Sequence, residues 1–75
     1  MAVSYQKLFS ILPDKGITPT EMMREAGFSA NILTRLRREQ YISLGNIEKI
    51  CRVLNCGVDE ILEFVPDKKE NNNYD

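Results

Sequence analysis

Residues 18–38, TPTEMMREAGFSANILTRLRR, constrain the fold more than any other part of the chain. Thr18 is a favourable N-cap, and Pro19 follows it at the first helical position, where a missing N–H costs nothing. Glu21 completes the Ser/Thr-x-x-Glu capping box, and Gly27 ends the helix because glycine reaches a positive φ without steric penalty. The segment therefore predicts a short capped helix, a glycine turn and a second helix.

The second helix, over about residues 29–38, is expected to bury one face and expose the other. Ser29 is placed to cap it, and its apolar face consists of Phe28, Ile32, Leu33 and Leu36. Its opposite side carries Ala30, Asn31, Thr34, Arg35 and Arg38. Asparagine pairs with adenine, arginine pairs with guanine, and the methyl groups of threonine and alanine contact thymine. The arginines alone fit a solvated helix face equally well, but the whole unit predicts a helix that reads the major groove of DNA.

Length and composition indicate one small globular domain. The chain has 75 residues, of which 43% are hydrophobic. It contains no apolar run of about 18 residues, so no membrane span is expected. Its N-terminus lacks the basic start, long apolar stretch and small-residue cleavage site of a signal peptide. We therefore expect a cytoplasmic protein that makes no contact with a membrane.

The distribution of charge matters more for DNA binding than the net charge of −1. Residues 1–58 carry a balance of +3, whereas residues 59–75 carry −4. The basic excess lies with the candidate recognition helix, where contacts to phosphates need it. Non-specific affinity is expected to be weaker than that of a strongly basic domain.

The sequence predicts no metal, cofactor, small-molecule ligand or catalytic centre. Cys51 and Cys56 are the only cysteines and there is no histidine, so a zinc site lacks ligands. Cys51 falls on the apolar stripe of a predicted helix and is expected to be a buried, reduced thiol. Without a Gly-rich phosphate loop or a nucleophile elbow, the sequence predicts a protein that is not an enzyme.

The pattern along the chain predicts an all-α fold, a compact five-helix bundle. The expected helices span about Val3–Leu12, Pro19–Ala26, Ser29–Arg38, Ser43–Leu54 and Val58–Phe64. Outside the central pair, the residues expected to face inward are Tyr5, Leu8, Phe9, Leu12, Leu44, Ile47, Ile50, Cys51, Leu54, Val58, Ile61 and Leu62. Pro13–Gly16 is expected to end the first helix, and no strand is expected. Residues 1–65 form the predicted domain, and residues 66–75 a disordered acidic tail.

With these residues laid out, the chain resembles the Cro/C1-type (Xre-like) helix-turn-helix family of bacterial and phage regulators. The resemblance covers about residues 4–65 and rests on residues 18–38 and on the later stretch YISLGNIEKICRVLNCGVDEILEF. It implies a lambda-repressor-like DNA-binding domain. The positions that match the groove-facing ones are Ser29, Ala30, Asn31, Thr34 and Arg35. Those expected near phosphates are Thr18, Thr20, Arg38, Gln40, Tyr41 and Ser43, and the charge of Arg37 also suits a phosphate.

The expected function is sequence-specific binding of double-stranded DNA by a transcriptional regulator, most simply a repressor. A homodimer on a palindromic site is expected because one small helix reads few base pairs. Ile61, Phe64 and Val65 either supply that interface or cap the core. The alternative is a protein-interaction or antitoxin-like module on the same fold, which the near-neutral charge and the acidic C-terminus favour.

Overall fold

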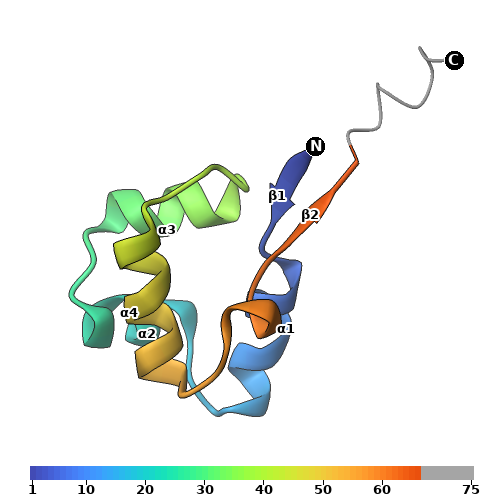
Figure 1. The fold of residues 1–75 in the computed structure, drawn as a ribbon. Helices are drawn as coiled ribbons and strands as arrows, with labels where there is room; N and C mark the ends of the chain where they lie inside the picture. The colour runs from blue at the N-terminus through green and yellow to red at the C-terminus, as the bar shows by residue number, and fades with distance from the viewer. Residues whose placement is uncertain (67–75) are drawn as a thin grey trace, which may run out of the picture.

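The structure, a computed structural model, describes residues 1–66. In chain order, its elements are β1 (Ala2–Ser4), α1 (Gln6–Asp14), α2 (Pro19–Ala26), α3 (Ala30–Arg37), α4 (Leu44–Leu54), a 3₁₀ turn (Val58–Glu60) and β2 (Glu63–Val65) (Figure 1). No helix in this part of the chain is long and apolar enough to cross a membrane. Apart from Pro66, the predicted acidic tail lies outside the described residues.

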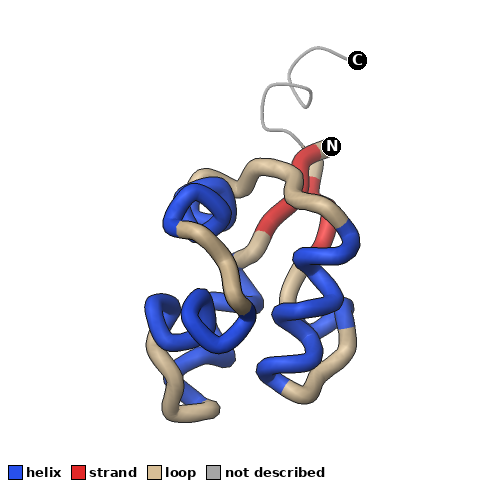
Figure 2. Tube along the Cα trace, turned by 90° about the vertical axis from the view of Figure 1, so that its left-hand side faces the viewer, coloured by secondary structure: helices blue, strands red, loops and turns tan. Residues whose placement is uncertain are grey.

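The fold is mostly helical, but the prediction of five helices is wrong. Residues 1–66 contain four α-helices and a two-stranded antiparallel sheet, in which Ala2 pairs with Val65 and Val3 with Phe64 (Figure 2). The predicted first helix starts later, at Gln6, and the predicted fifth helix is a single 3₁₀ turn followed by β2. Strands of three residues are too short to show an alternating pattern, so the sequence did not reveal them.

Each α-helix of the described part ends on a residue in the left-handed conformation. The N–H of the following residue then bonds to a carbonyl five residues back, as in a Schellman motif. The left-handed residues are Gly16 (φ 71°), Gly27 (φ 80°), Glu39 (φ 57°) and Asn55 (φ 54°). The N–H donors and carbonyl acceptors are Ile17 and Leu12, Phe28 and Met23, Gln40 and Arg35, and Cys56 and Cys51, with N···O distances of 2.9–3.1 Å. Because Pro13 lies inside α1, Gly16 rather than Pro13 ends that helix.

The buried core draws on every helix and on the N-terminal strand. It consists of Val3, Tyr5, Leu8, Leu12, Met22, Leu33, Leu36, Ile47, Ile50, Leu54 and Ile61. This confirms most of the predicted inward positions. The expectation for Leu44 was wrong, because its side chain is 83% exposed. Helical side chains tilt toward the N-terminus, so a residue in the first turn reaches past the end of its helix.

Outside the central pair, four further residues predicted to face inward are not fully buried, and these are Phe9, Cys51, Val58 and Leu62. Val58 is about half exposed, because a 3₁₀ turn of three residues has no continuous apolar stripe. Cys51 is half-buried and unoxidised, and so is Cys56. Partial burial raises the pKa of both thiols, which therefore stay protonated at neutral pH.

Thr18→Ala is expected to destabilise the fold by about 0.5–2 kcal/mol, because the predicted capping box is present. The Thr18 hydroxyl oxygen accepts from the Glu21 N–H at 3.1 Å, and a Glu21 carboxylate oxygen accepts from the Thr18 N–H at 2.9 Å. Urea denaturation measures the loss. Thr20→Ala is the matched control, because Thr20 lies exposed in the same turn outside this box. Equal losses for the two variants would contradict the assigned role of the cap.

Candidate nucleic-acid interface

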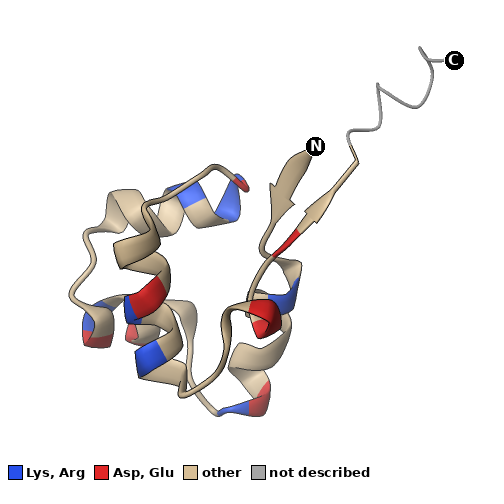
Figure 3. Cartoon of the chain, viewed as in Figure 1, with Lys and Arg blue, Asp and Glu red and all other residues tan. Residues whose placement is uncertain are grey.

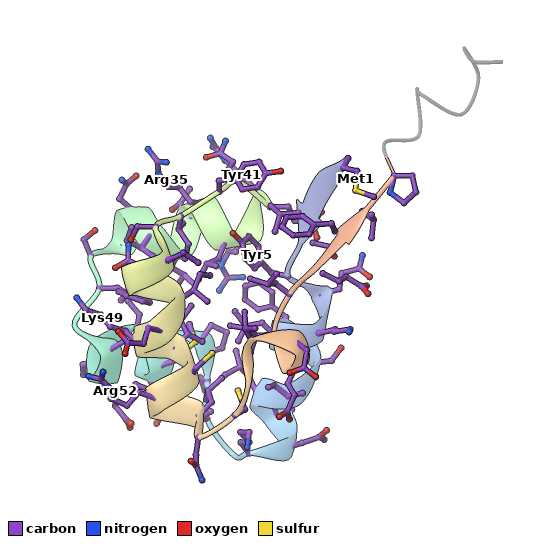
Figure 4. The ribbon with its side chains drawn as sticks, in the orientation of Figure 1. Met1, Tyr5, Arg35, Tyr41, Lys49 and Arg52 are labelled. Carbon is purple, nitrogen blue, oxygen red and sulfur yellow. The ribbon has the colours of Figure 1, made fainter. Side chains whose placement is uncertain are left out.

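One face of α3 is buried in the core, and the opposite face is exposed to solvent. Leu33 and Leu36 lie in the core, whereas the positions exposed along this helix and at its end include Ala30, Asn31, Thr34, Arg35 and Arg38. Figure 4 shows Arg35 at the outer end of the molecule, on the same side as Tyr41. The helix is therefore anchored by leucines and presents a strip of polar and cationic side chains.

The orientation of Thr34 is fixed by its own helix. Its hydroxyl donates to the carbonyl oxygen of Ala30 at 3.2 Å. With the hydroxyl held against the backbone, the methyl group is the part of Thr34 that remains for a partner. A methyl group on this strip suits the apolar contact with the thymine methyl, whereas Asn31 and Arg35 offer hydrogen-bonding groups.

The C-terminal end of α3 is tied to the N-terminal segment of the chain. The buried Tyr5 hydroxyl donates to the carbonyl oxygen of Gln40 at 2.8 Å, and the buried Ser4 hydroxyl donates to the Glu39 carboxylate at 3.2 Å. Burial raises the pKa of Tyr5, so its hydroxyl keeps the proton that it donates. We call Ser4, Tyr5, Glu39 and Gln40 the α3 clamp. Its contacts span 35 residues of sequence, and no local signal pointed to them.

The starts of the helices that flank α3 hold the predicted phosphate-contacting hydroxyls. The Ser43 oxygen accepts from the Asn46 N–H at 3.2 Å, as Thr18 does at α2. Both oxygens act as acceptors, so each hydroxyl hydrogen remains available to an anion. Ser29 takes the N-cap conformation without a side-chain cap bond, and Thr20 and Tyr41 are exposed. Helix N-termini carry a partial positive charge that favours phosphate.

Arg37 differs from the other arginines of α3. Its guanidinium lies 5.8 Å from the centre of the Phe9 ring, a cation–π contact with α1. This contact draws the side chain toward α1 and away from the strip that contains Arg35. Of the three arginines at the end of α3, Arg37 therefore has a partner within the protein.

The cations at the end of α3 are followed directly by an acidic residue. Arg35, Arg37 and Arg38 precede Glu39, and Figure 3 shows this basic end of α3 beside one acidic position. Glu39 takes a positive φ of 57°, which costs a non-glycine residue about 1–2 kcal/mol. Sequence reasoning missed Glu39, because glutamate is an unusual residue at this conformation.

Glu39→Gly is expected to tighten binding to any DNA duplex by a few-fold. The variant removes a negative charge beside the candidate phosphate contacts and relieves the left-handed backbone, while it loses the bond from Ser4. Glu39→Gln is the matched control, because it removes the charge and retains the strained φ. Fluorescence anisotropy measures affinity and urea denaturation measures stability. Weaker DNA binding by both variants would contradict an electrostatic role.

Comparisons with known proteins agree with this geometry. Residues 7–67 match the family model described as the Cro/C1-type HTH DNA-binding domain. The fold is similar to the crystal structure of the transcriptional regulator VanUg, with a TM-score of 0.85 and 32% sequence identity over 88% of each chain. No curated protein gave a significant match. The matched residues include α2, α3, α4 and the residues that connect α3 to α4. The chain therefore belongs to the Cro/C1-type helix-turn-helix DNA-binding family.

Proposed function

We propose that the chain is a sequence-specific DNA-binding transcriptional regulator that inserts α3 into the major groove. The observation that carries this proposal is the division of α3 into a buried leucine face and an exposed polar strip. Arg35 and Asn31 are assigned to hydrogen bonds with base edges. Ser29, Ala30 and Thr34 complete the surface that faces the bases.

The proposed phosphate contacts lie on both sides of α3. They are Thr18, Thr20, Arg38, Gln40, Tyr41 and Ser43. Arg37 is left out of this set because its guanidinium lies over Phe9. Contacts on both flanks fix the depth and angle of a recognition helix, while the residues on α3 read the sequence.

Arg38→Ala is expected to weaken binding to all duplexes alike and to lower the slope of log K against log salt by about 0.9. The reason is that one cation no longer displaces a counterion from the DNA. Arg37→Ala, which removes the same charge from a side chain held on Phe9, is the matched control and should change the slope less. Anisotropy titrations at several salt concentrations measure both. A larger change in slope for Arg37→Ala would reverse the assignment.

The proposal includes a homodimer on a palindromic operator, repression and a cytoplasmic location. A dimer doubles the number of base pairs read, which a helix of eight residues needs for selectivity. Repression requires only that the bound protein occupies a promoter. Ile61 is buried in the core and is therefore not available to a dimer interface, whereas Phe64 is 58% exposed and is available.

The test is a fluorescence-anisotropy titration against the DNA upstream of the protein's own gene and against random duplex, each at two salt concentrations. Much tighter binding to the upstream DNA, with a steep salt dependence for both, is expected. If the affinities for the upstream DNA and for random duplex are equal, the preferred sequence is sought by selection from a randomised duplex library. If selection also yields no enriched sequence, the proposal fails and the protein-interaction function replaces it.

A further inference from the structure

Tyr5 is held firmly at the point where β1 leads into α1. It is the N-cap residue of α1, where its backbone carbonyl accepts from the Phe9 N–H at 3.2 Å, and its side chain is 1% exposed. The hydroxyl of this buried ring donates to the Gln40 carbonyl at 2.8 Å. Figure 4 shows Tyr5 inside the molecule, with Arg35 and Tyr41 at its outer end. Because packing locks the ring, the ring in turn fixes the backbone to which it bonds.

The contact from Tyr5 continues through Gln40 to Arg35. The N–H of Gln40 donates to the Arg35 carbonyl at 2.9 Å, while the carbonyl of Gln40 accepts from Tyr5. Both backbone polar groups of Gln40 are therefore bonded within the protein, and its exposed side chain remains available to a phosphate. Arg35 is assigned to a base and Gln40 to a phosphate, so one buried hydroxyl supports both kinds of contact.

The Ser4 side chain ties the same turn to the start of α1. Its hydroxyl accepts from the Gln6 N–H at 3.3 Å and donates to the Glu39 carboxylate at 3.2 Å. Glu39 has the positive φ at which the chain leaves α3, and such a conformation persists only where the surrounding structure holds it. The turn after α3 is therefore held from outside the helix-turn-helix unit.

We propose that Tyr5 is a positioning residue for DNA recognition, which sets the angle at which α3 presents Arg35 to the bases. The inference rests on the proposed function and deepens it. Ser4 supports the same role through Glu39. The residues that read the sequence lie on α3, whereas the residue that fixes their geometry lies at the start of α1 and touches no DNA.

The packing of α3 explains why it needs this anchor. Of its eight residues, Leu33 and Leu36 are buried, and they hold one face of the helix without fixing its C-terminal end. Contacts with base edges require the reading side chains to be placed within about 0.5 Å and about 10–20°. Attraction to phosphates acts over about 10 Å and carries no sequence information. Loss of the anchor should therefore reduce discrimination between sequences more than affinity for DNA as a whole.

The test is the ratio of the affinities for the selected operator and for random duplex, measured by fluorescence anisotropy. Tyr5→Phe keeps the buried ring and removes the donor, and it should lower this ratio by about 5–30-fold. Tyr41→Phe is the matched variant, because it removes the same group from an exposed residue assigned to a phosphate. It should weaken binding to both duplexes alike and leave the ratio unchanged. Ser4→Ala should lower the ratio as Tyr5→Phe does, and it replaces that variant if Tyr5→Phe does not fold.

Two further measurements separate positioning from stability. Leu54→Val truncates a buried side chain at the C-terminal end of α4, far from the α3 clamp in Figure 1. It should lower the stability measured by urea denaturation without changing the ratio. In the free protein, amide hydrogen exchange at Gln40 should be faster in Tyr5→Phe than in Leu54→Val, because the N–H bond to Arg35 has lost its support.

The outcomes separate this inference from the proposed function. Equal losses of operator and random binding in Tyr5→Phe, or an equal fall in the ratio in Leu54→Val, would overturn the positioning role and leave the regulator standing. Unchanged exchange at Gln40 in Tyr5→Phe would overturn it as well, and this measurement needs no DNA. If the unaltered protein selects no sequence, the proposed function itself fails.

Discussion

Arg35→Ala is expected to weaken binding to the selected operator by about 1–3 kcal/mol, a loss of roughly 5–150-fold, and to relax specificity at one base pair. The side chain lies on the exposed strip of α3, opposite the buried Leu33 and Leu36. A bidentate arginine that loses its guanine contact loses discrimination, whereas a phosphate contact affects all sequences equally. Competition titrations with the operator and its single-base variants measure the change.

The control for Arg35 is Arg52→Ala. Arg52 carries the same charge on α4 and pairs with Glu48 at 3.0 Å, and Figure 4 shows it well away from Arg35. This variant should bind the operator and its single-base variants as the unaltered protein does. Arg35 is not a base-reading residue if its loss lowers operator and random binding by the same factor.

Leu36→Ala is expected to cost about 2–5 kcal/mol of the free energy of unfolding. Leu36 is 0% exposed and holds α3 to the core, so its truncation leaves a cavity beneath the recognition helix. Domains of this size have a total stability of about 5–15 kcal/mol, so the loss is a large share. Urea denaturation measures it, and the apparent DNA affinity near the midpoint of unfolding should fall in parallel.

Leu44→Ala is the matched control for this second prediction. The sequence pattern assigns both leucines to the core, but Leu44 is 83% exposed. Its truncation should change the free energy of unfolding by less than about 0.5 kcal/mol. Similar losses at the two positions would mean that Leu44 packs inward after all.

The parts of the fold that the sequence predicted are those specified by residues close together in the chain. The capping box at Thr18, the end of α2 at Gly27 and the cap at Ser43 each depend on contacts within four residues. The buried faces of α1, α3 and α4 follow from helical periodicity for the same reason. Because α3 is short and its leucines are unambiguous, the exposed strip could also be predicted.

The parts that escaped prediction depend on contacts between distant residues. The two-stranded sheet of β1 and β2 joins residues 2–4 to residues 63–65, and the α3 clamp joins Tyr5 to Gln40. Neither the strand pairing nor the clamp produces a recognisable sequence pattern in the residues that form it. The exposure of Leu44 and Val58 escaped for a different reason. Both fit an inward stripe in the sequence, but Leu44 lies in the first turn of α4 and Val58 lies in a 3₁₀ turn.

The α3 clamp also has a consequence for synthesis of the chain on the ribosome. The segment that holds the end of α3 is made early, but the strand that pairs with it, Glu63–Val65, is made only after all four α-helices. A nascent chain therefore holds both motif helices before β1 has its partner. Release of a product that stops before residue 63 would leave Ser4 and Tyr5 without the paired strand that supports their contacts to α3. Such an incomplete product should therefore compete poorly with the finished protein for operator DNA.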